Sequence, residues 1–174
     1  MRIMNKYYGC NEFQVKYLSE AIKFDELNDI ENAKINYLKV INIEDSVPYA
    51  NSMLGGIEYD KGNFQEAIKY FDKAIELYPN CVQSIELRAE AKERLGFLDS
   101  ALNDYYKVIE ITSDYAQVYF NIGLIYEFKK EYYRALRFYR LAKRINPSNF
   151  IFINKYEKFT RYIKYLKKNF PHKL

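Results

Sequence analysis

A period of 34 residues runs through most of this chain of 174 residues. Aligned on that spacing, the sequence divides without a gap or insertion into four windows, residues 14–47, 48–81, 82–115 and 116–149. A short unit that recurs in this way cannot bury its apolar face alone, so neighbouring units must stack to build a core. The period therefore predicts a repeat architecture.

Four positions of every window carry the same kind of residue. The eighth is small, the twentieth is alanine, the twenty-fourth is aromatic and the thirtieth is aliphatic. Apolar and small residues that stay in phase with a repeat are expected to face the core. The predicted core residues are Ala21, Gly55, Ala89 and Gly123; Ala33, Ala67, Ala101 and Ala135; Tyr37, Phe71, Tyr105 and Tyr139; and Ile43, Leu77, Ile111 and Ile145.

Each window has the pattern of two amphipathic helices joined by a short turn, with apolar residues three and four positions apart. Gly62 and Gly96 stand where a first helix should end, and Pro48 suits the first turn of a helix. We expect the small eighth residue to face the alanine at position twenty, so that two antiparallel helices approach closely. The aromatic residue at position twenty-four should then fill the gap toward the next pair.

This pattern resembles the tetratricopeptide-repeat family, whose consensus has a small residue at position 8, aromatic residues at 11 and 24, alanine at 20 and proline at 32. The fourth window carries Gly123, Tyr126, Ala135, Tyr139 and Pro147, and the second window is nearly as good. The other two windows depart from the consensus, with Asp45 and Ser113 in place of the proline and Lys92 in place of an aromatic residue. The resemblance implies an all-α fold, a right-handed α-solenoid of antiparallel helix pairs.

The residues outside the four repeats (14–149) divide into three segments. Residues 1–13 are too short for another pair and are expected to extend the first helix. Residues 150–170 predict one amphipathic helix that caps the last repeat, and residues 171–174 a flexible tail. The chain carries a formal net charge of +4. The predicted cap and the tail together are its basic part.

Several classes of function lack support in the sequence. There is no catalytic or metal-binding spacing, the single histidine is His172, and Cys10 and Cys81 lie too far apart to suggest a disulfide framework. No stretch is long and apolar enough to span a membrane, and the first residues do not resemble a secretory signal. We therefore predict a cytoplasmic protein without enzymatic activity, metal or cofactor.

In the family, positions 2, 5, 6, 9, 12 and 13 of each first helix line the concave groove. Transferred to this chain, these positions are rich in apolar and aromatic residues, which are common where proteins bind proteins. They are also acidic. The predicted partner-binding residues are Ile22, Glu26, Tyr49, Met53, Tyr59, Asp60, Glu86, Leu87, Glu90, Phe120, Asn121, Leu124 and Phe128.

The acidity of these positions predicts the chemistry of the ligand. Seven carboxylates face one basic residue, Arg94, so an apolar peptide or helix with basic flanks would fit best. The plainer interpretation is that some of these residues contact neighbouring repeats and the others are ordinary surface. The family's carboxylate clamp for chaperone tails is absent, because its positions hold Leu18, Ile22, Met53, Gln83 and Leu87 in one register and Ser52, Gly56, Leu87, Gln117 and Asn121 in the next.

The basic helix at residues 150–170 has three interpretations. It caps the array with a solvated outer face, or it contacts nucleic acid or an anionic surface through its lysines and arginine. In the third interpretation it meets the acidic groove of a second copy and forms a homo-oligomer. The main prediction remains a scaffold that binds another protein, and the alternative is a nucleic-acid-associated adaptor.

Overall fold

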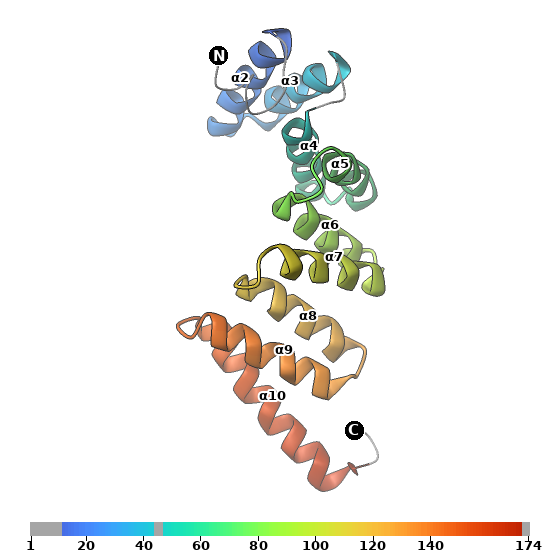
Figure 1. The fold of residues 1–174 in the computed structure, drawn as a ribbon, viewed down its shortest axis with the longest axis vertical. Coiled ribbons are helices and arrows are strands. Elements are labelled where there is room, and N and C mark those ends of the chain that lie inside the picture. Colours follow the sequence, from blue (N-terminus) through green and yellow to red (C-terminus); the bar gives the residue numbers. More distant parts are fainter. Residues whose placement is uncertain (1–11, 44–46, 172–174) are drawn as a thin grey trace. The chain divides into compact units, whose positions relative to one another are not determined.

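The computed structural model describes residues 12–43 and 47–171, and these are all-α (Figure 1). This part of the chain contains nine helices and no strand. The helices are α2 (Glu12–Glu26), α3 (Ile30–Ile43), α4 (Pro48–Asp60), α5 (Phe64–Leu77), α6 (Val82–Arg94), α7 (Leu98–Ile111), α8 (Ala116–Phe128), α9 (Tyr132–Ile145) and α10 (Phe150–Asn169).

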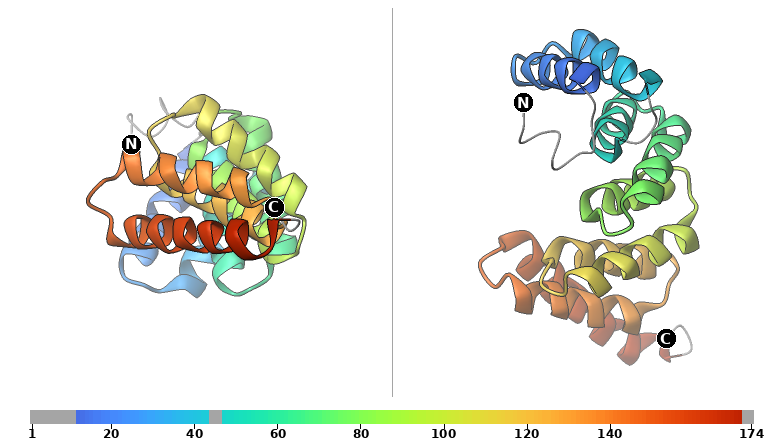
Figure 2. Two further views of the ribbon diagram at one scale, coloured as in Figure 1. Left: turned by 90° about the horizontal axis from the view of Figure 1, so that it is seen from below. Right: turned by 45° about the horizontal axis from the view of Figure 1, so that its top comes forward.

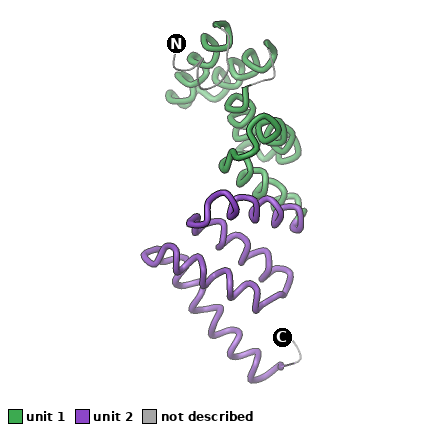
Figure 3. Tube along the Cα trace, viewed as in Figure 1, with its two compact units in different colours: residues 1–97 green, residues 98–174 purple. Residues whose placement is uncertain are grey.

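The chain forms two compact units, residues 1–97 and residues 98–174, which we call unit 1 and unit 2 (Figure 3). In unit 1, α2 packs on α3 and α4 packs on α5, each pair being joined by a tight turn. In unit 2, α8 and α9 form the corresponding pair, and α10 runs alongside α9 (Figure 2). Each of these pairs is an antiparallel helical hairpin, as the repeat pattern predicts.

The turn inside each repeat uses one residue in the left-handed region of the backbone. Gly62 has φ of +78° and Gly96 has φ of +81°, so the prediction that these glycines end a helix is confirmed. The equivalent residues of the first and fourth repeats are Asn28, with φ of 56°, and Lys130, with φ of 62°. Asparagine tolerates this conformation better than lysine does. The fourth repeat therefore holds a lysine backbone in an unfavourable conformation.

The predicted core positions are confirmed at three of the four places in the repeat. The four alanines at position twenty and the four aromatic residues at position twenty-four are completely buried, and the small residues at position eight are buried as well. Position thirty was predicted wrongly at two of its four residues, since Ile43 is 41% exposed and Ile111 is 37% exposed, whereas Leu77 and Ile145 are half-buried. All four residues are the last of their helices, α3, α5, α7 and α9. Fewer neighbouring atoms cover a side chain at the end of a helix than one in its middle.

In the second and fourth repeats, the small eighth residue lies closest to an aromatic ring, a contact that was not predicted. A Cβ atom on Gly55 would lie 2.6 Å from the ring of Phe71, and a Cβ atom on Gly123 would lie 2.6 Å from the ring of Tyr139. The small eighth residue therefore faces the aromatic side chain at position twenty-four of its own pair. The same ring also reaches the following helix, because Tyr139 contacts Phe159 of α10 at 5.3 Å between ring centroids.

Helix α10 begins at an asparagine cap, where the Asn149 side chain accepts hydrogen bonds from the backbone N–H groups of Ile151 and Phe152. One face of the helix is buried, through Phe152, Phe159, Ile163 and Leu166. The other face is exposed and carries Lys158, Arg161, Lys164 and Lys168.

Some predictions fall on residues that the structure does not describe. Residues 1–11 of the predicted N-terminal extension, Cys10, and His172 in the predicted tail lie outside the described residues. Within residues 12–43 and 47–171, no helix is long and apolar enough to cross a membrane.

Candidate functional site

The larger candidate pocket lies in unit 1 and has a volume of about 540 Å³. Four helices and one turn contribute to it, because the first helices of successive repeats place their groove-facing side chains next to one another. We call it the unit 1 pocket. Its lining residues are Asp25, Ile30, Glu31, Ser52, Met53, Gly56, Ile57, Tyr59, Asp60, Lys61, Gln83 and Leu87.

The apolar part of the unit 1 pocket comes mainly from α4 and α6, and α3 adds Ile30. Met53 and Leu87 are half-buried, and Gly56 lies between the positions of Met53 and Tyr59 on α4. A Cβ atom on Gly56 would meet no other atom within 4 Å. The missing side chain therefore leaves space in the pocket, whereas the adjacent Gly55 is covered by a ring.

The charged part of the unit 1 pocket is mostly acidic. Asp25 accepts a hydrogen bond from the Tyr37 hydroxyl at 3.3 Å, and Glu31 forms an ion pair with Lys61 at 2.7 Å. The hydrogen bond from Lys61 lowers the pKa of Glu31. Asp60 is exposed and forms no ion pair with any residue that the structure describes. Three carboxylates against one ammonium group leave the pocket with a net charge of −2.

Tyr59 connects the wall of the unit 1 pocket to the third repeat. Its hydroxyl donates to the Glu90 carboxylate at 3.1 Å, and its ring contacts Phe64 edge-on at 5.3 Å. Burial, and after it the charge of Glu90, raises the pKa of the Tyr59 hydroxyl to about 12. The hydroxyl therefore remains a neutral donor near neutral pH, and it holds the ring in place.

The predicted binding residues of unit 1 fall into two groups. The structure brings Met53, Tyr59, Asp60 and Leu87 together in the pocket. The others do not line it. Ile22 and Tyr49 pack against the core of the first two repeats, Glu86 is buried, Glu90 holds Tyr59, and Glu26 is exposed elsewhere.

The predicted binding residues of unit 2 are mostly packing residues. Phe120 lies 5.6 Å from Tyr139 and 5.0 Å from Phe152 between ring centroids, and Leu124 is half-buried. Asn121 is buried and donates to the Tyr105 hydroxyl at 3.3 Å. Only Phe128 is well exposed, at 77%, among these four.

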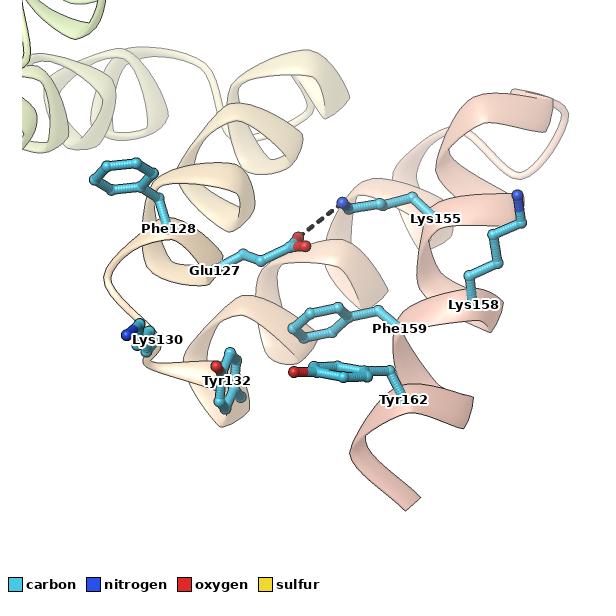
Figure 4. Close-up of a pocket in the computed structure, with 8 residues that line it drawn as sticks. All are labelled: Glu127, Phe128, Lys130, Tyr132, Lys155, Lys158, Phe159 and Tyr162. Atoms are coloured by element: carbon cyan, nitrogen blue, oxygen red, sulfur yellow. Dashed lines mark ion pairs between the residues drawn. The ribbon is translucent and has the colours of Figure 1, made fainter. Parts of the chain in front are cut away.

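A second pocket lies in unit 2, between the α8–α9 turn and the middle of α10 (Figure 4). We call it the unit 2 pocket, and its volume is about 480 Å³. Phe159 and Tyr162 extend from α10 toward Tyr132, and Lys155 reaches the carboxylate of Glu127 (Figure 4). The lining residues are Glu127, Phe128, Lys130, Tyr132, Lys155, Lys158, Phe159 and Tyr162.

Two features of these sites are absent from the predicted set. First, the lysines and rings that α10 adds to the unit 2 pocket were missed, because the 34-residue period ends at residue 149 and α10 was interpreted mainly as a cap.

Second, the tyrosine at position twenty-four donates a hydrogen bond to the carboxylate at position twelve, as Tyr37 does to Asp25 and Tyr139 does to Glu127. The spacing of twelve residues recurs in the sequence and was the available signal. Both carboxylates were counted as ligand-facing acidity, although part of their capacity is used internally.

Burial, followed by the hydrogen bond to Glu127, raises the pKa of Tyr139 well above its usual range. Glu127 also forms an ion pair with Lys155 at 2.8 Å, and the Lys155 ammonium lies 5.3 Å from the centre of the Tyr139 ring. The three side chains form one network, and two of them, Glu127 and Lys155, also line the unit 2 pocket. Within the described ranges, no group of three or more His, Cys, Asp or Glu residues is arranged to hold a metal ion.

An array of antiparallel helix pairs with a constant period and an in-phase small residue, alanine and aromatic residue defines a helical-repeat protein. The model of the tetratricopeptide repeat matches residues 48–81 and residues 116–149, which are the second and fourth windows of the period. The chain is a tetratricopeptide-repeat protein, and its fold is the all-α solenoid type of that family.

Several of the curated relatives are Hsp70-Hsp90 organizing proteins. The chain is 30% identical over 146 residues to Hsp70-Hsp90 organizing protein 3 of Arabidopsis thaliana, across 80% of this chain and 25% of that protein. It is 28% identical over 130 residues to Hsp70-Hsp90 organizing protein of Triticum aestivum, across 71% of this chain and 21% of that protein. The chain thus spans about a quarter of the length of these relatives.

Solved structures share the fold. The crystal structure of MamA protein has a TM-score of 0.76 at 19% identity, covering 91% of this chain and 96% of that chain. The first tetratricopeptide domain of Spaghetti, bound to the HSP90 peptide SRMEEVD, has a TM-score of 0.63 at 20% identity, covering 67% and 93%.

Proposed function

We propose that the protein is a non-catalytic, cytoplasmic adaptor whose unit 1 pocket binds a peptide or helix of a partner protein, and that the bound segment has an apolar centre and basic flanks. The observation that carries this proposal is the combination, in one pocket, of the open position at Gly56 with an apolar wall and a net negative charge. The relatives support the general role, since tetratricopeptide proteins include the Spaghetti domain with its bound peptide.

The apolar wall of the unit 1 pocket can adapt to ligand side chains of different shapes. Met53 has an unbranched and polarizable side chain, which adapts to different ligand groups. Leu87 contacts the same space from α6. An apolar side chain placed over Gly56 would leave water and fill a recess that the protein itself leaves open.

The charges of the pocket favour basic flanks. Asp60 is exposed and unpaired among the described residues, and within the same part of the chain the Tyr37 hydroxyl is the one group that Asp25 binds. A lysine or arginine of the ligand would complement these carboxylates and accelerate association.

An acidic chaperone tail is a poor ligand for this pocket. Met53, Gln83 and Leu87 occupy positions where the family's clamp requires asparagine or basic residues, and none of them carries a positive charge. Lys61, the one lysine of the lining, is already paired with Glu31. We therefore propose that this chain differs in ligand from the Spaghetti domain that binds SRMEEVD.

The test compares two labelled peptides that share a leucine-rich centre and differ only in lysine or glutamate flanks. Fluorescence anisotropy of the full chain should give tighter binding of the lysine-flanked peptide. Gly56→Leu combined with Asp60→Lys should weaken that peptide by about tenfold, because the recess is filled and one attractive charge is reversed.

The matched control places the same kinds of change on exposed positions of α5, as Gln65→Leu combined with Glu76→Lys. These residues do not line the pocket, so the control should bind as the unmodified chain does. Equal loss in both double variants, or tighter binding of the glutamate-flanked peptide that depends on Asp60, would refute the proposal.

A second candidate function rests on the exposed face of α10. Lys158, Arg161, Lys164 and Lys168 share this surface, and Tyr165 is 55% exposed. A basic helix of this kind attracts phosphates without sequence specificity. Binding of a single-stranded oligonucleotide that weakens steeply with salt and is lost in Lys164→Glu combined with Lys168→Glu would favour this candidate. Undiminished binding of the oligonucleotide by that variant would reject it.

A further inference from the structure

We propose that the unit 2 pocket is a second peptide site with the opposite charge preference, and that it takes an acidic segment bearing an apolar or aromatic side chain. This inference is independent of the unit 1 pocket, since the two pockets share no residue. It also assigns a binding role to α10 beyond covering the last repeat.

The charge of the unit 2 pocket is the first argument. Its lining contains Lys130, Lys155 and Lys158 against the single carboxylate of Glu127, which gives a net charge of +2. The Glu127 carboxylate already has partners, because it forms an ion pair with Lys155 at 2.8 Å and accepts a hydrogen bond from the Tyr139 hydroxyl. Lys130 and Lys158 form no ion pair with any residue in the described part of the chain. Two ammonium groups therefore remain for the carboxylates of a ligand.

The aromatic wall is the second argument. Tyr132 of α9 lies 5.8 Å from Tyr162 and 6.2 Å from Phe159, both on α10, measured between ring centroids. These rings are held by one another, so a ligand would not have to order them on binding. Phe128 is 77% exposed at the edge of the same pocket. An apolar side chain of the ligand would cover this ring.

The ring geometry favours a peptide over single-stranded nucleic acid. Tyr132 and Tyr162 meet at 89°, so the edge of one ring lies against the other, and Phe159 is buried. Sequence-tolerant nucleic-acid binding uses several exposed ring faces on which successive bases can stack, whereas Phe128 alone among the four lining rings is more than half exposed. Edge-packed rings beside lysines instead suit a short segment that offers carboxylates and one apolar side chain.

The backbone conformation of Lys130 also supports the inference. This residue adopts φ of 62°, a region in which a lysine is less stable than glycine, and the second repeat has Gly62 at the equivalent position. The fourth repeat thus keeps a long cationic side chain at a turn where glycine would fit the backbone better. Strained positions of this kind are concentrated at functional sites.

The experiment uses the full chain and the two labelled peptides described above. The glutamate-flanked peptide should lose about tenfold in affinity in Lys130→Glu combined with Lys158→Glu, since two attractive charges are reversed. The matched control, Lys164→Glu combined with Lys167→Glu, makes the same change of net charge at exposed positions of α10 outside the pocket. The control should bind within about twofold of the unmodified chain.

A third variant guards against an effect on folding. Phe128→Ala changes a side chain that is 77% exposed, so the fold should be retained while binding of the glutamate-flanked peptide weakens. Circular dichroism checks the helix content of each variant. The lysine-flanked peptide should still bind all of them, which separates this inference from the function proposed for unit 1.

Three results would overturn the inference. One is an equal loss in the pocket variant and its control, which would mean that only the overall charge of α10 matters. Another is the absence of any binding of the glutamate-flanked peptide by the unmodified chain. The last is binding of an oligonucleotide that depends on Lys130, Lys158 and Phe128 while binding of the peptide does not. That result would assign the pocket to nucleic acid.

Discussion

The second and fourth repeats place different chemistry at position eleven of the same structural unit. In the second, Glu58 is 4% exposed and accepts hydrogen bonds from Lys34 and from Asn63. In the fourth, Tyr126 is 7% exposed, stacks on Phe138 at 5.6 Å and shares a hydrogen bond of 2.9 Å with the Tyr106 hydroxyl. The repeat therefore requires that this space be filled and its polar atoms be satisfied, and it does not require one residue type.

The largest expected effect comes from removing the partner of the buried carboxylate. Lys34→Ala leaves Glu58 without its cation, and the loss of one member of a buried pair costs several kcal/mol. Because the Lys34 side chain is 26% exposed, water compensates in part, and we expect a destabilisation of about 2 to 3 kcal/mol. Chemical denaturation measures it.

The control for this prediction is Lys69→Ala, which removes an exposed lysine that pairs with Glu66 on the same helix. Its effect should stay below about 0.5 kcal/mol. A similar loss of stability in both variants would mean that the contacts of Glu58 contribute nothing specific to the free energy of unfolding. The difference between Glu58 and Tyr126 would then have no energetic consequence.

A shared feature of the two repeats sharpens the comparison. Gly55→Ala and Gly123→Ala should each destabilise by about 1 to 2 kcal/mol, since the added methyl group would meet a buried ring at 2.6 Å. Gly56→Ala is the matched control on the same helix. It has open space, so it should be neutral or stabilise the helix by up to about 1 kcal/mol. Thermal unfolding ranks the three, and equal effects at Gly55 and Gly56 would contradict the described packing.

The dependence of stability on pH should distinguish the two solutions at position eleven. The hydrogen bond from Lys34, and then that from Asn63, lowers the pKa of the Glu58 carboxyl from its ordinary value of 4.5. This contribution to stability is present above pH 4.5 and is lost as the pH falls through the lowered pKa. In Glu58→Gln the decrease in the free energy of unfolding below pH 4.5 should be smaller than in the unmodified chain. An unchanged profile would assign the acid sensitivity to other carboxylates.

The smallest effect concerns the turn that follows position eleven. Lys130→Gly, which restores the residue type of Gly62, should stabilise the chain by about 0.5 to 1 kcal/mol because the strained backbone is relieved. The same variant should bind the glutamate-flanked peptide less tightly. The corresponding exchange Gly62→Lys should destabilise by a similar amount. If Lys130→Gly were destabilising, the lysine side chain would make a structural contribution that its contacts do not reveal.

The regular part of this protein could be predicted from sequence because it is repeated. Alanine at position twenty and an aromatic residue at twenty-four recur in every window, and both are completely buried. The contacts of Glu58 could not be predicted in this way, since Lys34 lies on a different repeat and nothing in the period pairs them. The groove positions of the family identified Met53, Tyr59, Asp60 and Leu87, but they could not tell exposed residues from packing residues such as Phe120.

The open position at Gly56 makes the size of the unit 1 pocket adjustable by substitution. Because the backbone there is helical and an added Cβ atom meets nothing within 4 Å, alanine should fit without disturbing α4, and valine and leucine should reduce the recess in further steps. The size at which a given peptide ceases to bind then measures how far its side chain enters. Substitutions at this single position would thus measure how deeply a ligand side chain inserts when the structure of the complex is unknown.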